Sequence, residues 1–249
     1  DCDLVANLDF QSMIAFHEEK GAEITLAYRR EKIRREGNEN IVVFDAEDDG
    51  RVGRVWLSPQ MEEEQNVYLN VAVMKRELLE KIVEEARSRN KRSFTKDILI
   101  EQSDSMRIYA YEIEKYVMRI NSLQDYFDAS MALLHPQVRQ ELFPAERPVL
   151  TRVRDQVPAK YGLGAIVKNS LVADGCIIEG TVENSIIFRG AKIGRGAAIR
   201  DSIIMAGAVI GAGARLEYVV ADRDATIRDT RMLVGYKTYP LFIEKKSVI

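Results

Sequence analysis

The last third of this sequence repeats itself, and this repeat limits the possible folds more than any other feature. Four similar segments, NSLV, NSII, DSII and EYVV, begin at residues 169, 184, 201 and 217, at intervals of 15, 17 and 16 residues. An ordinary mixed domain has no reason to keep such a period, whereas a solenoid of stacked coils does.

A shorter period of six residues runs inside each repeat. Aliphatic residues occur at Ile187, Ile193, Ile199, Ile204, Ile210 and Leu216, and Gly-Ala pairs occur at 190–191, 196–197, 207–208 and 213–214. Six residues suit one short strand and one tight turn, so three hexapeptides form one triangular coil with the aliphatic residue inside. Ordinary strands punctuated by glycine are the alternative, but they would alternate with a period of two. The repeat therefore predicts a parallel β-helix.

The composition is that of a soluble globular protein. A length of 249 residues leaves room for two domains, and the net charge of −3 argues against nucleic-acid binding. No apolar run approaches the length that spans a membrane, so we expect no membrane association. Cys2 and Cys176 lie far apart in the sequence. A disulfide is therefore not expected, and a reducing, cytoplasmic location is.

The earlier part of the chain has the sequence pattern of an α/β domain. Helices are predicted at 8–20, 75–89 and 122–134, and strands at 22–28, 41–44, 52–57, 67–74, 106–111 and 116–120. Asp48-Asp49-Gly50 is a turn signal between two strands, and Ser122 is a predicted helix N-cap. We therefore expect an α/β domain at 1–142, a proline-bearing linker at 143–164 and the β-helix at 165–249.

This order of parts resembles the glucose-1-phosphate adenylyltransferase (ADP-glucose pyrophosphorylase) family. Residues 2–21 are similar to the family's G-D-H-x-Y-x-x-D-Y segment and the helix after it, and GYKTYPLFIEKKSVI (235–249) is similar to the end of the regulatory, D-type subunit of glycogen synthesis. The resemblance implies a Rossmann-like nucleotidyltransferase domain and a left-handed β-helix. It also implies that the chain is the later part of a longer protein, because the glycine-rich nucleotide loop precedes these segments in the family.

The resemblance also assigns the family's catalytic positions to residues of this chain. Asp3 falls on the first Mg²⁺-binding aspartate, although helix or turn capping is an equally good interpretation of this residue. Ser58 replaces the lysine that binds the sugar phosphate, and Arg119 replaces the second metal-binding aspartate. Tyr68 and Asn70 replace small residues of the sugar pocket. These substitutions replace residues that bind the metal, the phosphate or the sugar in the resembling family. We therefore expect no catalytic residues in this chain, and we expect bound Mg²⁺ only if the protein is active.

Three classes of function remain open. The first is a regulatory subunit that associates with a catalytic adenylyltransferase subunit or with itself, with aliphatic edges near Val172 and Val220 as contact surfaces. The second is an active adenylyltransferase. The third, a hexapeptide-repeat acyltransferase, is disfavoured because its usual catalytic base is a histidine in or beside the β-helix, and none follows His135. Both histidines, His17 on an exposed-looking run and His135, are expected to be structural.

Four cations around the linker are candidate binders of phosphorylated effectors. They are Arg147, Arg152, Arg154 and Lys160. The resemblance implies effector binding between the domains, whereas a solvated linker is the simpler explanation of the same charges.

Overall fold

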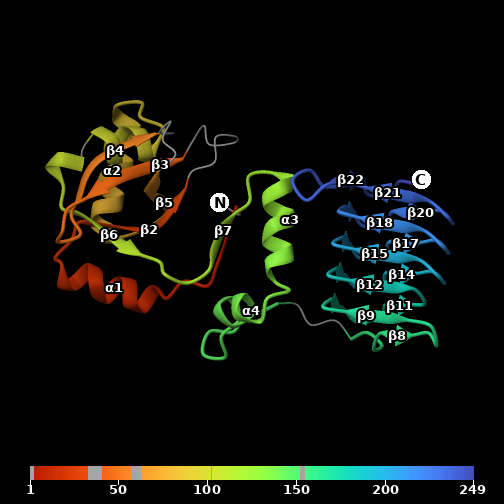
Figure 1. Ribbon diagram of the computed structural model, residues 1–249. Helices are drawn as coiled ribbons and strands as arrows, with labels where there is room; N and C mark the ends of the chain where they lie inside the picture. Colours follow the sequence, from red (N-terminus) through yellow and green to blue (C-terminus); the bar gives the residue numbers. More distant parts are fainter. Residues whose placement is uncertain (1–2, 33–40, 58–62, 102, 152–154) are drawn as a thin grey trace. The chain divides into compact units, whose positions relative to one another are not determined.

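The structure is a computed structural model, and it describes residues 3–32, 41–57, 63–101, 103–151 and 155–249. The chain divides into two compact units, Asp1–Val117 and Met118–Ile249. The first is an α/β unit and the second contains the β-helix (Figure 1). The predicted order of an α/β region followed by a parallel β-helix is confirmed.

The first unit is built on a mixed five-stranded sheet. Its elements are β1 (Leu4–Ala6), α1 (Phe10–Glu19), β2 (Ile24–Lys32), β3 (Val42–Ala46), β4 (Val52–Leu57), β5 (Glu64–Met74), α2 (Arg76–Ser88), the π-helix η1 (Thr95–Ile100), the 3₁₀ turn η2 (Ser103–Ser105) and β6 (Ile108–Glu112). The strand order is β4-β3-β5-β2-β6, with only β2 and β6 parallel. β1 also pairs with β7 (Val117–Arg119) in a two-stranded sheet, and β7 continues past Val117, where the first unit ends.

The alternation of side chains along β2 separates two layers of core. Leu26 belongs to a cluster that contains Ile82 of α2, whereas Ala27 belongs to a cluster that contains Met13 of α1. Successive residues of a strand point to opposite faces, so α1 and α2 cover opposite faces of the sheet. Gly21, at φ +55°, follows the end of α1 and turns the chain into β2.

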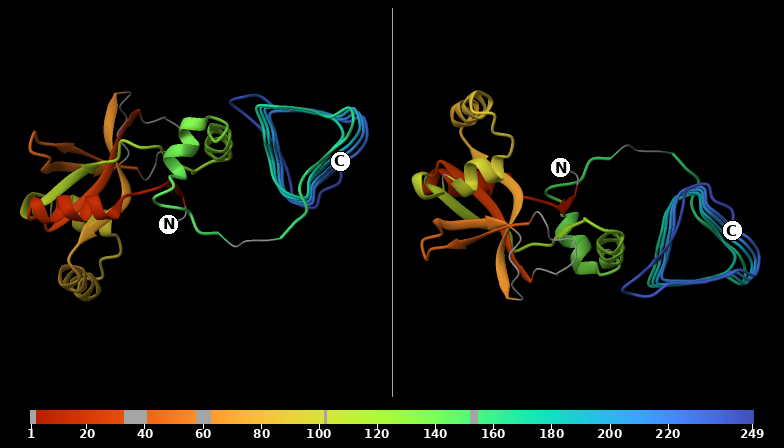
Figure 2. Two further views of the ribbon diagram at one scale, coloured as in Figure 1. Left: turned by 90° about the horizontal axis from the view of Figure 1, so that it is seen from below. Right: turned by 90° about the horizontal axis from the view of Figure 1, so that it is seen from above.

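Among the described residues of the second unit, fifteen short strands form three parallel sheets. The strands are β8 (Lys160–Tyr161), β9 (Ile166–Lys168), β10 (Leu171–Val172), β11 (Ile177–Ile178), β12 (Thr181–Glu183), β13 (Ile186–Ile187), β14 (Lys192–Ile193), β15 (Ala198–Arg200), β16 (Ile203–Ile204), β17 (Val209–Ile210), β18 (Arg215–Glu217), β19 (Val219–Ala221), β20 (Thr226–Ile227), β21 (Met232–Val234) and β22 (Leu241–Ile243). Figure 2 shows their triangular cross-section.

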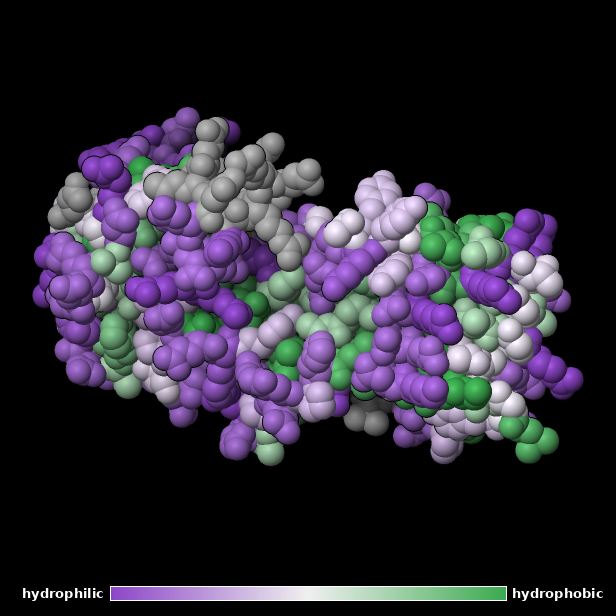
Figure 3. All heavy atoms as spheres, in the orientation of Figure 1, coloured by the Kyte–Doolittle hydropathy of each residue, from purple (hydrophilic) through white to green (hydrophobic). Residues whose placement is uncertain are grey.

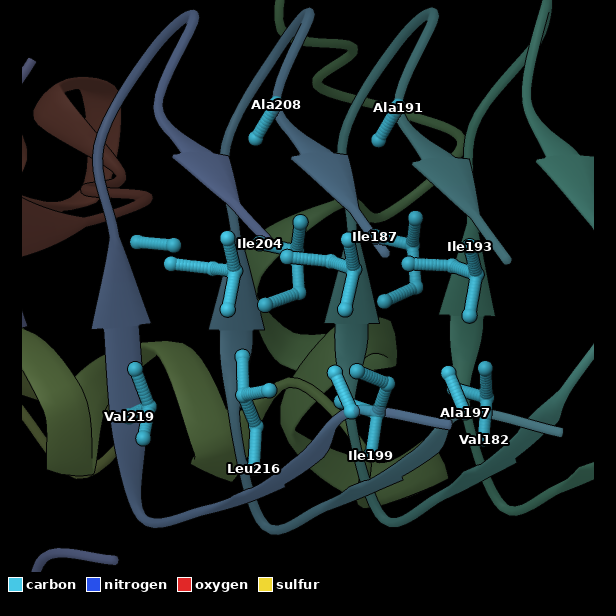
Figure 4. Close-up of a cluster of buried hydrophobic side chains, with 14 of the residues drawn as sticks. Val182, Ile187, Ala191, Ile193, Ala197, Ile199, Ile204, Ala208, Leu216 and Val219 are labelled. Carbon is cyan, nitrogen blue, oxygen red and sulfur yellow. The ribbon is translucent and has the colours of Figure 1, made fainter. Parts of the chain in front are cut away.

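The interior of the β-helix is the predicted aliphatic stack. The six aliphatic residues named above are all at most 1% exposed, and those labelled in Figure 4 point inward from successive coils. Gly190, Gly196, Gly207 and Gly213 have φ between +66° and +74°, and the alanine after each is buried. The Gly-Ala pairs therefore form the predicted corners, because glycine adopts positive φ without a Cβ penalty.

A second set of corners, with left-handed backbone, shows at which residue each repeat begins. Asn169, Asn184 and Asp201 have φ between +42° and +46°, and Tyr218 has φ +52°. In the strand register Arg200 pairs with Glu217 and Ile203 with Val220, so Tyr218 lies over Asp201. The fourth repeat therefore begins at Tyr218, and the sequence reading that started it at Glu217 was wrong by one residue.

Two helices, α3 (Leu123–Ala132) and α4 (Pro136–Leu142), belong to the second unit. Ser122 caps α3 as predicted, since its side chain accepts a hydrogen bond from Asp125 N at 3.0 Å. Phe127 packs against Ile203 and Val220 on the outside of the β-helix, and both aliphatic residues are fully buried. The expected open edge at Val220 is therefore wrong. The boundaries of the linker remain a prediction.

Hydrophobic side chains remain exposed elsewhere on the β-helix. Figure 3 shows hydrophobic residues among the strands of this unit. They include Ile166, Ile177, Met232 and Val234, each at least 38% exposed. Association through the β-helix remains a prediction. Across the described residues no helix is both long and apolar enough to cross a membrane.

Candidate functional site

The three predicted catalytic positions are not all described by the structure. Asp3 directly precedes β1 in the first unit, and Arg119 ends β7 in the second. Ser58 lies outside the described residues. The Oδ1 atom of Asp3 is buried and has no hydrogen-bond partner in the described part of the chain, so it makes no capping contact there.

The described residues contain no cluster of side chains already arranged to hold a metal ion. Nowhere among them do three or more His, Cys, Asp or Glu side chains lie together in a group that could hold a metal ion. Arg119 carries a guanidinium with hydrogen-bond donors only, so it cannot ligate a cation.

The residues predicted to obstruct the sugar pocket have different surroundings. Tyr68 is 4% exposed and packs in the core of the first unit with Phe44 and Leu26. Asn70 is exposed and has φ +58°, a left-handed conformation that favours glycine and that asparagine also adopts. The buried position of Tyr68 means that its side chain fills the core and does not extend into solvent.

His17 is buried, and the expectation of an exposed residue was wrong. Its Nδ1 lies 2.8 Å from Thr25 Oγ1, and its Nε2 is buried with no partner among the described residues. Desolvation, followed by the positive charge of Lys75, lowers the pKa of His17, while Glu18 acts in the opposite direction. The sequence reading failed because His17 is on the side of α1 that faces β2. His135 is exposed at the N-cap of α4.

The predicted effector cations are only partly described. Arg147 follows α4 and is partly buried, and Lys160 begins β8 and is exposed. Arg152 and Arg154 lie outside the described residues. Effector binding by these four cations remains a prediction.

The second unit contains a groove of about 440 Å³ that sequence reasoning did not find. We call it the corner groove. Its lining residues are Phe127, Asp128, Met131, Ala132, Leu134, His135, Asn169, Asn184, Asp201, Tyr218 and Lys237. One wall is therefore α3 and the start of α4, and the other is the set of left-handed corners of four successive coils.

Hydrogen bonds order the polar wall of the corner groove. Asn169 Nδ2 donates to Asn184 Oδ1 at 2.8 Å, and Asn184 in turn hydrogen-bonds Asp201. Burial raises the pKa of Asp201, the hydrogen bond from Asn184 opposes this, Glu217 raises it further, and Arg200 and Lys237 lower it. The Asp201 carboxylate is therefore poorly solvated, and further hydrogen-bond donors would stabilise its charge.

Aromatic side chains form the adjoining part of the wall. The rings of Phe127 and Tyr218 are 6.4 Å apart. Beside them, Gln124 Nε2 donates to Asp128 Oδ1 and to the Lys237 carbonyl, both at 2.9 Å. The signal that could have located this wall was the polar residue that opens each repeat, because a left-handed corner favours Asn and Asp.

Comparison with known proteins gives matches to both parts of the chain. The family described as GlmU-like, C-terminal hexapeptide, matches residues 156–239. The glycogen biosynthesis protein GlgD of Bacillus subtilis is 43% identical over 147 residues, which cover 59% of this chain and 43% of that protein. GlgD of Geobacillus stearothermophilus is 51% identical over 71 residues, or 28% of this chain and 21% of that protein.

A longer but weaker match extends further along the chain. The glucose-1-phosphate adenylyltransferase of Fusobacterium nucleatum is 26% identical over 202 residues, which cover 80% of this chain and 52% of that protein. The chain thus spans about half or less of the length of these three relatives. Its fold, its hexapeptide repeats and these identities make it a relative of the GlgD and glucose-1-phosphate adenylyltransferase proteins, resembling their later part.

Proposed function

We propose that the chain is part of a regulatory, non-catalytic subunit of glucose-1-phosphate adenylyltransferase in glycogen biosynthesis. The observation that carries the proposal is Arg119, a cation at the position where the resemblance places a Mg²⁺-binding carboxylate. The identity to two GlgD proteins supports the same assignment.

The chemistry of adenylyl transfer explains why the substitutions matter. A sugar phosphate attacks the α-phosphorus of ATP and pyrophosphate leaves, so the reaction needs Mg²⁺ held by carboxylates and cations that neutralise phosphate oxygens. Arg119 would repel Mg²⁺, and Ser58 cannot neutralise a phosphate as lysine does. Each loss should lower the rate by about 10²-fold or more.

An active adenylyltransferase with a rearranged site is the second candidate, and Asp3 is the residue that favours it. This carboxylate is retained at the first metal position of the resembling family, and its Oδ1 makes no hydrogen bond in the described part of the chain. If the protein is active, Mg²⁺ is its expected cofactor. A cytoplasmic hetero-oligomer with a catalytic subunit, or a homo-oligomer, is the expected assembly.

The test is an assay of ADP-glucose formation from ATP and glucose 1-phosphate. The full-length protein alone should make little or none, and it should change the rate or the effector response of a catalytic subunit when the two are mixed. Substantial activity of the unmodified protein alone, or no effect on the catalytic subunit, would overturn the proposal.

A pair of substitutions locates the defect. Combining Ser58→Lys with Arg119→Asp should recover some turnover in the full-length protein, and either change alone should recover little, because both groups act on one transition state. The single variants are the matched controls. Equal recovery in one single variant would show that only that position limits the reaction.

A further inference from the structure

Gln124 of α3, which is not among the lining residues, contacts two residues of the corner groove. Gln124 Nε2 donates twice, to Asp128 and to Lys237, which identifies the other amide atom as the carbonyl oxygen. That Oε1 is buried and has no partner among the described residues. Through these two hydrogen bonds Gln124 holds Asp128 and the Lys237 backbone in place at the groove.

The polar wall presents acceptors in a regular column. The coils stack at the spacing of parallel strands, about 4.8 Å, so the side chains at the left-handed corners lie one above the other. The column contains the amides of Asn169 and Asn184 and the carboxylate of Asp201, which accepts from Asn184 and has lone pairs left for other donors. A ligand that matches this column carries several hydroxyl groups, each able to donate to one of these oxygens.

Apolar contact comes from both walls. Tyr218 ends the column of corners, and Met131 and the largely buried Phe127 lie on α3. A lining that combines a column of polar groups with an aromatic ring and apolar side chains suits a ligand with hydroxyl groups on its edges and C–H bonds on its faces.

The charges of the lining decide between a neutral and an anionic ligand. Among the described lining residues Asp128 and Asp201 are acidic, whereas Lys237 is the one lysine or arginine. A phosphate placed among these groups would face two carboxylates for one ammonium. The lining therefore disfavours phosphorylated ligands and accepts uncharged ones.

We propose that the corner groove is a binding site for a neutral, polyhydroxylated ligand of the size of one or two sugar rings. The volume of about 440 Å³ lies within the usual range for small-molecule sites. Asp201 and the Asn169–Asn184 ladder orient the hydroxyl groups, and Tyr218 and Met131 contact the ring faces. This site lies within the second unit, and it requires no catalytic activity of the chain.

The experiment is calorimetric titration of the full-length protein with glucose and with maltose, beside glucose 1-phosphate and inorganic phosphate as charged probes. The neutral sugars should bind, and Asp201→Asn should weaken that binding at least about tenfold, the effect expected when a hydrogen bond to a charged group is lost. Asparagine is well tolerated at a left-handed corner, so this variant should fold.

Asp224→Asn is the matched control. Asp224 is also an aspartate at positive φ, +59°, on a corner of the same β-helix, and it is not part of the groove lining. This variant should leave sugar binding unchanged. Three results would overturn the proposal: no binding of either neutral sugar, equal binding by Asp201→Asn and the unmodified protein, or tighter binding of glucose 1-phosphate than of glucose.

Discussion

A ladder of serine hydroxyls within the β-helix leads to the prediction that Ser202→Ala destabilises the second unit. Ser202 is fully buried, and its Oγ accepts a hydrogen bond from the Val219 amide at 3.0 Å. The same Oγ donates to the Arg200 carbonyl at 2.6 Å. One coil earlier, Ser185 Oγ accepts from the Ser202 amide in the same way, at 3.1 Å.

The expected magnitude follows from what the substitution leaves behind. Alanine removes the acceptor of the Val219 amide, and the position of the Ser202 hydroxyl is fully buried, so water cannot replace it without opening the coil. An unsatisfied buried donor costs about 1–3 kcal/mol. The Arg200 carbonyl still accepts from the Tyr218 amide at 3.3 Å, so it adds little to the cost.

Ser170→Ala provides the control within the same ladder. Ser170 Oγ accepts from the Ser185 amide at 3.1 Å, but Ser170 lies in the first coil and is only partly buried. Water can therefore take the place of this hydroxyl, and the cost should stay below about 1 kcal/mol.

Scanning calorimetry and amide hydrogen exchange test this comparison. At about 2–4 °C per kcal/mol, Ser202→Ala should lower the melting temperature of the β-helix transition by about 2–12 °C, and it should speed exchange at the Val219 amide. The reasoning is refuted if Ser170→Ala is as destabilising as Ser202→Ala, or if exchange at Val219 does not change.

Three further predictions concern stability. Gly194→Ala should be more destabilising than Gly196→Ala in scanning calorimetry, because a Cβ at Gly194 would lie 2.8 Å from backbone atoms. A Cβ at Gly196 would meet open space, so that variant should cost only about 1–2 kcal/mol, the cost of placing alanine in the left-handed conformation. Ile204→Asp should cost several kcal/mol, since it buries an unpaired charge, and unchanged thermal stability would contradict the interior position. The lowered pKa of His17 means that the unfolded state binds its proton more readily. This residue's contribution to stability is therefore present above its ordinary pKa of 6.5 and is lost as the pH falls below it. Denaturant titrations at several pH values should show this loss of stability in the unmodified protein and not in His17→Gln.

The β-helix was predictable because its stabilising contacts repeat in the sequence. Each coil buries the same kind of residue at the same register, so Ile187, Ile204 and Ala221 occupy one column of paired positions. A six-residue period therefore reports the fold directly. Helices α1 and α2 and strands β2 to β6 of the first unit were also predicted, within a few residues, from their periods of 3.6 and two, whereas β1, η1 and η2 were not.

Contacts between distant segments were not predictable from these local patterns. The burial of His17 depends on Thr25 in the next strand, and the burial of Val220 depends on Phe127, which lies 93 residues earlier in the chain. The corner groove requires the same packing of α3 against the β-helix. A period identifies which face of an element is apolar, but it does not identify the element that covers that face.

The error in the fourth repeat has a physical cause in the last coil. In the earlier coils the residue after each left-handed corner is serine, because its hydroxyl must accept from the amide stacked on it. Val219 occupies this position in the fourth coil, and the residue stacked on it is Leu241. The Leu241 amide donates instead to the Tyr218 carbonyl at 2.9 Å. No hydroxyl is needed, so an apolar side chain can join the interior, where Val219 is fully buried. The loss of the serine, which hid the correct register from sequence comparison, thus follows from the way β22 closes the stack.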